Sequence, residues 1–515
     1  MTSEERPHDV LHDVMEMTHS AMEALSHSAL VGDADGRVKR HGTVLGSTAT
    51  LANCAIGAGV LAIPYAVSEL GYGLGGGVVF AAALLVVFTL IVLVRAGSTF
   101  GSSSYQGLVR DAFGGKVAQG VSAVLIIYLF GSCVAYLIII GDSYTKVMSA
   151  IAASSDDAWW ASRRFAIAVV AALAVTPLSL LREMSRLAPA SAIALFALAY
   201  TALAIMAKGF EKSAGDTAQA VAFKLDVSSV SAVPIVVFAF QCHIQVLAIF
   251  AELSANGASE QNVDYDPLDE RRERESEERR VSRMFTVIAC AVGMCFVGYL
   301  AVGEFAYISH PDVTSNVLNS YDKSDKAMLI ATVLMGCSAV ASFPVNHHAA
   351  RAALDDLLAS AFGWEQCAPG QAPANRHVSQ TFGFVGLATI VSFMVKDLGK
   401  VFELIGATCG SLVMFIIPAA LLLHPRMRSS KNSSTSGPLD DLEGLDDVTR
   451  ELLSSARDLL ERDFAEGDDG LNLDELDDGS ADAPTGGVIF VASILCLIAV
   501  FVATSNVYVI FFVKR

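Results

Sequence analysis

The chain has 515 residues, of which 53% are hydrophobic and only 17% are charged. Soluble domains carry roughly 25% charged residues, so this composition excludes an ordinary water-soluble protein. The formal net charge of −18 argues against nucleic acid as a partner. Much of that charge comes from one acidic segment, residues 439–482. The remaining apolar sequence predicts a protein that lies in a lipid bilayer.

Apolar stretches long enough to cross a bilayer recur along the whole chain. A transmembrane helix needs about 20 mostly apolar residues, whereas barrel strands alternate in polarity and run about ten residues. The helical requirement is met by 43–67, 73–94, 118–141, 164–181, 187–207, 229–252, 284–308, 327–345, 378–395, 400–423 and 486–513. We therefore expect an all-α membrane protein with about 11 transmembrane helices.

The polar segments between these stretches predict the domain organisation and the orientation. We expect a cytoplasmic N-terminal arm (1–42), a ten-helix core (43–423), an acidic low-complexity cytoplasmic loop (424–485) and an eleventh transmembrane helix (486–515). The N-terminal arm and the loops on its side of the membrane hold 23 of the 35 Lys and Arg residues. Cytoplasmic loops carry an excess of basic residues, so we expect a cytoplasmic N-terminus and an external C-terminus.

Cofactor and enzyme functions find little support. The nine cysteines form no spaced framework and no CxxC pair, which argues against a metal or redox centre. Nucleotide-binding motifs are also lacking. We expect no enzymatic activity and no cofactor.

The first apolar stretch contains residues that weaken a membrane helix near its middle. Gly57, Gly59 and Pro64 lie there, and glycine costs about 1 kcal/mol in a helix interior whereas proline costs about 3 kcal/mol. Membrane helices also use such residues for close packing between helices. At this point the stretch has two interpretations, a helix broken near its middle or a continuous helix that packs closely against its neighbours.

The sixth stretch places polar side chains at its centre, where they are costly in a membrane. Pro234 lies near its outer end, and Gln241, Cys242, His243 and Gln245 lie at or close to its centre. Such side chains usually face a cavity or the interior of the helix bundle. His243 has two interpretations, a hydrogen-bonded structural residue or a proton carrier.

The first and sixth stretches each begin a set of five. Transporters built from two inverted repeats interrupt the equivalent helices at the midplane, where helix N-termini attract anionic groups and freed carbonyls coordinate a cation. An amino acid carries both a carboxylate and an ammonium group. The pattern therefore favours an amino acid as substrate over a sugar or a lipid.

Four motifs, in this order, extend from residue 43 to about 355. They are Asn53-x-x-x-Gly57-x-Gly59-Val-Leu with Pro64 and Ala66, Phe238-Ala-Phe-Gln-Cys242-His243 with Val246-Leu and Glu252-Leu, Gly298-Tyr-Leu-x-x-Gly303 with Ser315-Asn-Val-Leu318, and Ser342-Phe-Pro344 with Arg351. In these motifs the sequence resembles the amino acid/auxin permease family. The resemblance is greatest to its sodium-coupled neutral and vacuolar amino acid transporters.

The resemblance implies a fold like that of the bacterial leucine transporter, with a 5+5 inverted repeat plus one extra helix. It implies that the backbone of two segments holds the substrate: Ile56, Gly57, Ala58, Gly59 and Val60 in the first stretch, and Phe240, Gln241, Cys242 and His243 in the sixth. It also implies that Asn53, Ile56 and a hydroxyl residue of the eighth stretch hold the cation. Arg351 is expected to cap the inner end of that eighth stretch.

The eighth stretch departs from the family pattern, because the family threonine falls on Cys337. A thiol is a poor ligand for a hard cation, although the adjacent Ser338 offers an oxygen. The departure weakens the case for Na⁺, and we expect uptake to depend more on a pH gradient than on sodium.

These observations predict a secondary active transporter that carries neutral amino acids with H⁺ or Na⁺, by symport or exchange through alternating access. The alternative is an amino acid sensor that signals through its cytoplasmic tails. The expected location is the plasma membrane or a vacuolar or lysosomal membrane.

Overall fold

The computed structural model describes residues 43–151, 159–182, 188–213, 220–253, 267–365, 372–429, 491–500 and 502, and its regular elements in these ranges are helices. The expected N-terminal arm (1–42) and most of the expected acidic loop lie outside the described residues.

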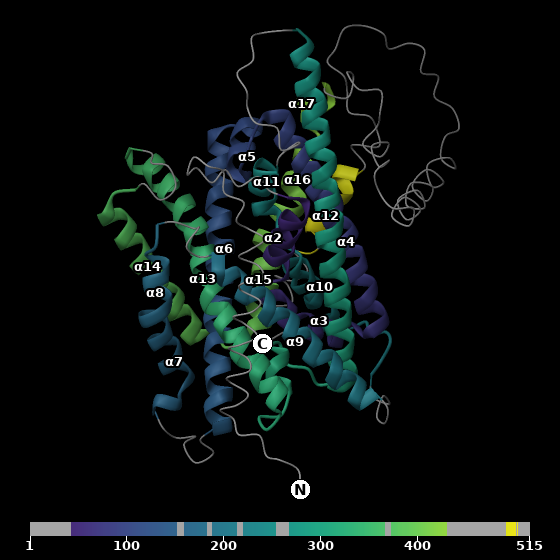
Figure 1. Ribbon diagram of the computed structural model, residues 1–515, viewed down its shortest axis with the longest axis vertical. Helices are drawn as coiled ribbons and strands as arrows, with labels where there is room; N and C mark the ends of the chain where they lie inside the picture. Colours follow the sequence, from purple (N-terminus) through teal and green to yellow (C-terminus); the bar gives the residue numbers. More distant parts are fainter. Residues whose placement is uncertain are drawn as a thin grey trace, which may run out of the picture.

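The first half of the helical body runs from α2 to α9 (Figure 1). Its elements are α2 (Val44–Ile56), η1 (Ala58–Leu61), α3 (Ile63–Leu70), α4 (Tyr72–Phe100), α5 (Tyr105–Phe113), α6 (Gly115–Ile151), η2 (Trp159–Ala161), α7 (Arg163–Val170), the π-helical turn η3 (Ala171–Val175), α8 (Thr176–Ser179) and α9 (Ala188–Ser213). The segments α7, η3 and α8 continue one another and form the fourth expected span.

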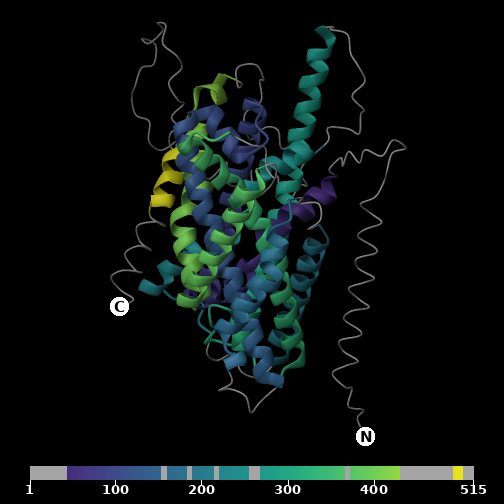
Figure 2. The same ribbon diagram turned by 90° about the vertical axis from the view of Figure 1, so that its left-hand side faces the viewer.

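The second half again begins with an interrupted pair of helices. Its elements are α10 (Val227–Ala239), α11 (His243–Glu252), α12 (Pro267–Ser309), η6 (Val317–Ser320), α13 (Lys326–Phe362), α14 (Ala374–Met394), α15 (Leu398–Ile405), the π-helical turns η7 (Gly406–Gly410) and η8 (Leu412–Ile416), α16 (Ile417–Leu422) and α17 (Pro425–Ser429). Figure 2 shows the N-terminal part of α12 rising beyond the rest of the body.

Polar side chains determine where several of these helices begin. Thr43 caps α2 by accepting a hydrogen bond from a backbone N–H of its first turn, and Asp325 and Asp397 do the same for α13 and α15. Asp226 and Ser229 form a reciprocal capping box at the start of α10. Such caps satisfy the N–H groups that have no partner within the helix.

The two long helices α6 and α13 pack against each other and run antiparallel across the body. At one end the Gln119 side chain of α6 donates to Ser360 of α13, and α5 and α17 lie at this end. At the other end α6 meets the loop that carries η6. We call these two ends the α5 face and the η6 face.

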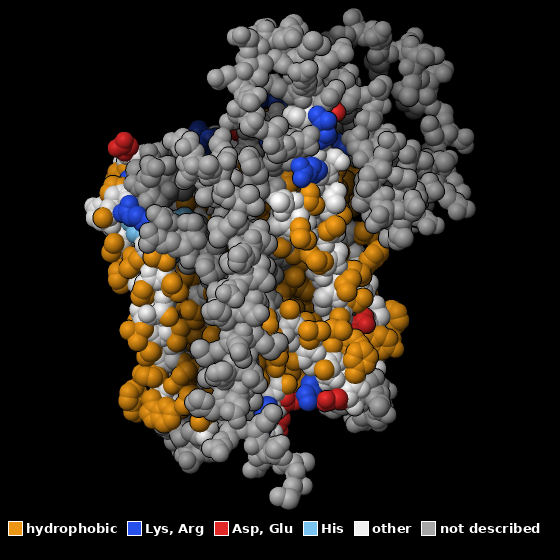
Figure 3. Space-filling view, in the orientation of Figure 1, with side chains coloured by type: hydrophobic (Ala, Val, Ile, Leu, Met, Phe, Trp, Pro, Cys, Tyr) orange, Lys and Arg blue, Asp and Glu red, His pale blue; other side chains and the backbone are white. Residues whose placement is uncertain are grey.

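The surface between the two faces is apolar. Leu84, Ile127, Leu203 and Ile390 are 45–65% exposed. On the face drawn in Figure 3, the described side chains of the middle are mostly apolar, and most charged side chains lie towards the two ends. Soluble monomers rarely expose so much contiguous apolar surface. The arrangement is that of a body surrounded by lipid.

The expected all-α membrane protein is confirmed. Each of the eleven apolar stretches contains described helical residues. Among the described residues, seven helices are long and apolar enough to cross a membrane, judged by length and composition. The other four stretches are not among these seven: the first and fourth are divided into shorter segments, the fifth forms α9, and the last is described only at residues 491–500 and 502.

Candidate substrate site between two interrupted helices

The first apolar stretch is interrupted at Gly57. Helix α2 ends at Ile56, Gly57 has φ 24° and ψ −145°, and η1 follows at Ala58. Residues with a side chain rarely adopt a positive φ of this kind. Pro64 then lies in the first turn of α3, where its missing N–H would have no helical partner anyway. The glycine and the proline therefore interrupt the helix.

The sixth stretch is interrupted at the equivalent place. Helix α10 ends at Ala239, and α11 begins at His243. Gln241 and Cys242 lie between them outside the helical pattern. Pro234 is inside α10 rather than at the interruption, so the polar residues, not the proline, mark the place where this helix breaks.

The two interruptions touch each other. A Cβ atom added at Gly59 would lie 2.7 Å from the Cα of Ala239, which is closer than real Cβ contacts come. From α12, the Tyr299 hydroxyl lies 2.9 Å from the carbonyl oxygen of Ala55 and 2.6 Å from that of Ala239. Its one proton is shared between the two carbonyls. Helix α12 therefore joins the ends of α2 and α10.

A cavity of about 130 Å³ lies beside these interruptions, midway along α6 and α13. Cavities of about 150 Å³ are known to hold a ligand of the size of benzene. The residues that line it are Asn53, Cys54, Ala55, Gly57, Ala58, Gly59, Tyr128, Leu129, Ser132, Tyr136, Ala194, Leu198, Phe238, Gln241, Gln245, Met335, Ser338, Ala341, Ser342, Val345, Asn346 and Phe402. Only a small molecule fits there.

The lining of the cavity is mixed, with apolar and uncharged polar residues. None of its described residues is an Asp, Glu, Lys, Arg or His. On one side, Phe238 stacks on Phe402 with ring centroids 4.4 Å apart and meets Tyr128 at 5.5 Å. Gln241 and Gln245 each have a buried side-chain atom without a hydrogen-bond partner. The cavity thus combines an aromatic wall with polar side chains that can form further hydrogen bonds to a ligand.

The structure brings half of the predicted substrate residues to this cavity. Those that line it are Asn53, Gly57, Ala58, Gly59 and Gln241, whereas Ile56, Val60, Phe240, Cys242 and His243 are not among its lining residues. Phe240 packs edge-on against the Tyr299 ring. His243 is fully buried with its Nε2 2.8 Å from the Thr89 hydroxyl. This geometry agrees with a structural role for His243.

The two predicted ion residues of the eighth stretch point in different directions. Ser338 of α13 is buried and lines the cavity together with Asn53. Cys337 is exposed and is not among the lining residues. The hydroxyl, rather than the thiol, therefore faces the site.

Several residues of the site escape sequence reasoning. The aromatic wall combines Tyr128 of α6 with Phe402 of α15, and no local pattern connects them. Tyr299 lies within a quoted motif, but its contact with both interruptions depends on how α12 packs. Glu403 follows Phe402 in the chain and is only 2% exposed, but it is not among the residues that line the cavity. An acidic residue inside an apolar span is nevertheless a signal that the sequence does contain.

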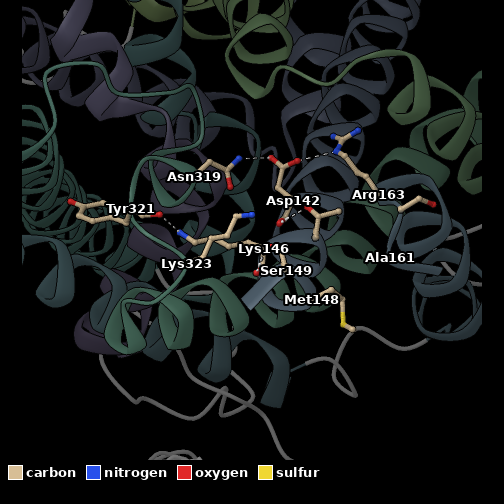
Figure 4. A pocket seen from close by; sticks show the side chains of 11 residues that line it. Asp142, Lys146, Met148, Ser149, Ala161, Arg163, Asn319, Tyr321 and Lys323 are labelled. Carbon is tan, nitrogen blue, oxygen red and sulfur yellow. Dashed lines mark hydrogen bonds and ion pairs between the residues drawn. The ribbon is translucent and has the colours of Figure 1, made fainter. Parts of the chain in front are cut away.

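A separate polar pocket at the η6 face lies between the ends of α6 and α7 and the loop that carries η6 (Figure 4). The carboxylate of Asp142 receives hydrogen bonds from Arg163 at 2.9 Å, Asn316 at 3.1 Å and Asn319 at 3.3 Å. One turn further along α6, the Lys146 ammonium donates to the carbonyls of Leu318 and Tyr321. These contacts fasten the loop to α6.

Comparisons with known proteins agree with this arrangement. Sodium-coupled neutral amino acid transporter 7 of Danio rerio is 26% identical over 403 residues, which are 76% of this chain and 81% of that protein. Its counterpart in Homo sapiens is 25% identical over 395 residues, 75% and 80% of the two chains. The crystal structure of MhsT with L-phenylalanine has a TM-score of 0.50 at 14% identity, over 90% of this chain and 99% of MhsT.

The likeness to MhsT confirms the expected leucine-transporter-like fold. The family described as transmembrane amino acid transporter protein matches residues 40–263 and 273–437, which is most of the chain. Together with the apolar helices, these findings establish an integral multi-pass membrane protein that transports amino acids and is a member of the transmembrane amino acid transporter protein family.

Proposed function

We propose that the chain is a sodium-coupled symporter of neutral amino acids and that the cavity beside the two interruptions is its substrate site. The observation that carries this proposal is the uncharged lining of the cavity at a place where four helix ends meet. The substrate side chain would then lie against Tyr128, Phe238 and Phe402.

The charged groups of the amino acid would be bound by the interruptions themselves. The N-terminus of α11 has no side-chain cap, and its partial positive charge favours a carboxylate. The C-termini of α2 and α10 carry a partial negative charge, which favours an ammonium group. A net-neutral substrate needs no charged side chain, and the described residues that line the cavity include none.

The position of Ser338 supports sodium as the coupled ion. Asn53 and Ser338 both bring oxygen atoms to the cavity, and oxygen ligands suit a hard cation. Cys337 occupies the position of the family threonine, but its thiol faces away from the cavity, so it does not argue against sodium as the coupled ion. The similar transporters carry sodium coupling in their names. Stronger dependence on a pH gradient stays an untested alternative.

We also place the α5 face in the cytoplasm. Helix α4 begins at the η6 face and ends beside α5, so α2, which precedes it, begins at the α5 face. The basic residues of the sequence are concentrated on the side of the N-terminal arm, and cytoplasmic loops are enriched in such residues. The η6 pocket then faces the outside or the lumen.

Uptake into proteoliposomes tests the proposal. The purified protein is reconstituted and offered a panel of radiolabelled neutral, acidic and basic amino acids under an inward Na⁺ gradient, an inward H⁺ gradient or neither. We expect accumulation of neutral amino acids that needs the Na⁺ gradient. Accumulation that persists without sodium, or that prefers charged amino acids, would reject the proposal.

A further inference from the structure

The Tyr299 hydroxyl lies where the two interrupted helices expose carbonyl groups. Ala55 is one residue before the end of α2, and Ala239 is the last residue of α10. The last carbonyls of a helix have no partner within it. Both of these carbonyls lie within hydrogen-bonding distance of the same hydroxyl, at 2.9 and 2.6 Å, and Tyr299 itself is fully buried.

Carbonyls freed at such interruptions are the groups that coordinate a coupling cation in transporters with this architecture. We propose that the Tyr299 hydroxyl replaces a cation between the two interruptions, so that Tyr299 is a positioning residue that holds them together. The inference rests on the proposed sodium-coupled function. It adds that the ion has no second site between the interruptions.

The surroundings of the hydroxyl support this assignment. Cys295 lies one turn before Tyr299 on α12, with its thiol 3.9 Å from the Ala52 carbonyl, and the ring of Phe240 packs edge-on against the Tyr299 ring. Sulfur and aromatic carbon are poor ligands for Na⁺, which prefers oxygen. A hydroxyl, in contrast, satisfies these carbonyls without any further ligand.

The same contact has a mechanical consequence. Cys295 and Tyr299 connect α12 to α2 and α10, and Gly59 touches Ala239 directly. Sodium that bridged the interruptions would bind and leave in each cycle, whereas a tyrosine hydroxyl stays. The two interruptions therefore keep a permanent link, and only the region of Asn53 and Ser338 is left for the ion. We expect one Na⁺ per amino acid.

The test compares Tyr299→Phe with Tyr307→Phe, a matched control on the same helix. Tyr307 is also buried, but its hydroxyl accepts from the Val221 amide, away from the interruptions. Uptake is measured in proteoliposomes as a function of Na⁺ and substrate concentration, and hydrogen exchange is measured over residues 52–60 and 236–243. The ratio of charge to substrate flux is measured for the wild type.

We expect Tyr299→Phe to lower uptake about tenfold, which corresponds to about 1.4 kcal/mol, and to raise hydrogen exchange in both segments together. Tyr307→Phe is expected to leave uptake and exchange in these segments close to wild type, and the wild type is expected to move one charge per neutral amino acid. Saturating Na⁺ is expected to leave the defect of Tyr299→Phe in place.

Three results would overturn the proposal. Recovery of Tyr299→Phe at high Na⁺ would show that the tyrosine oxygen is itself a cation ligand. A ratio of two charges per substrate would require a second cation. Exchange that is unchanged in both segments would show that the hydroxyl does not hold them. Hydrogen exchange needs no transport, so it tests Tyr299 even if the wild type accumulates no amino acid and the proposed function fails.

Discussion

Replacing Gly59 by alanine adds one methyl group at the contact between the two interrupted helices. The new Cβ would lie 2.7 Å from the Cα and 3.0 Å from the Cβ of Ala239, whereas ordinary contact begins at 3.4 Å. Both neighbours belong to the end of α10 and not to a flexible side chain, so the strain is relieved only if the backbones separate.

The expected magnitude follows from this geometry. Extra methyl groups in a packed interior cost about 1–3 kcal/mol, and each 1.4 kcal/mol is a factor of ten in an equilibrium constant. The added methyl group separates the two segments that line the proposed substrate site. We expect Gly59→Ala to lower the initial rate of sodium-driven uptake about tenfold and to lower the melting temperature of the purified protein.

The control is Gly77→Ala in α4, where an added Cβ meets nothing within 4 Å. Alanine is favoured over glycine in a helix by up to about 1 kcal/mol, so this variant is expected to transport normally and to be equally stable or slightly more stable. Wild-type uptake by Gly59→Ala would refute the idea that the two interruptions must touch.

Three further predictions concern the ion site and the scaffold. Asn53→Ala is expected to reduce uptake with normal membrane expression, and unchanged uptake with unchanged ion dependence would remove Asn53 from the site. Ser338→Ala is expected to weaken the stimulation of uptake by sodium, whereas Cys337→Ala is expected to leave it unchanged. Uptake is measured for both variants as a function of Na⁺ concentration. A larger loss of sodium stimulation in Cys337→Ala than in Ser338→Ala would contradict the proposed ion site. Arg351 is buried and donates to the Ser179 carbonyl at 2.9 Å. Arg351→Leu is therefore expected to lower stability by about 1–3 kcal/mol and to leave the KM for the amino acid unchanged. A normal melting temperature of this variant would show that the contact is dispensable.

The weak places in the two helices follow from local chemistry and were predictable from the sequence, although it left open whether the first stretch is broken or tightly packed there. Gly57 accepts a positive φ that other residues avoid, and polar residues at the centre of the sixth stretch are tolerated in a membrane only beside a cavity or the bundle interior. Both are properties of a few neighbouring residues. The helical spans were predictable for the same reason, because hydropathy is local.

The faces that the side chains present depend on packing. Ser338 and Cys337 are adjacent in sequence, yet the serine lines the cavity and the thiol is exposed. Arg351, expected to cap the end of its own helix, donates instead to a carbonyl at the end of α8. Consecutive helical residues point in directions about 100° apart, so only the packing of neighbouring helices decides which one reaches the site.

The sequence by itself determined that this protein is a helical membrane transporter with two weakened helices, because apolar length, glycine and buried polar residues act locally. Only the tertiary structure decided what joins those helices. Tyr299 lies more than 200 residues after Ala55 in the chain, and its hydroxyl reaches both interruptions because α12 packs against α2 and passes close to the end of α10. A contact of this kind depends on the relative position of three helices, and no local pattern of residues encodes it.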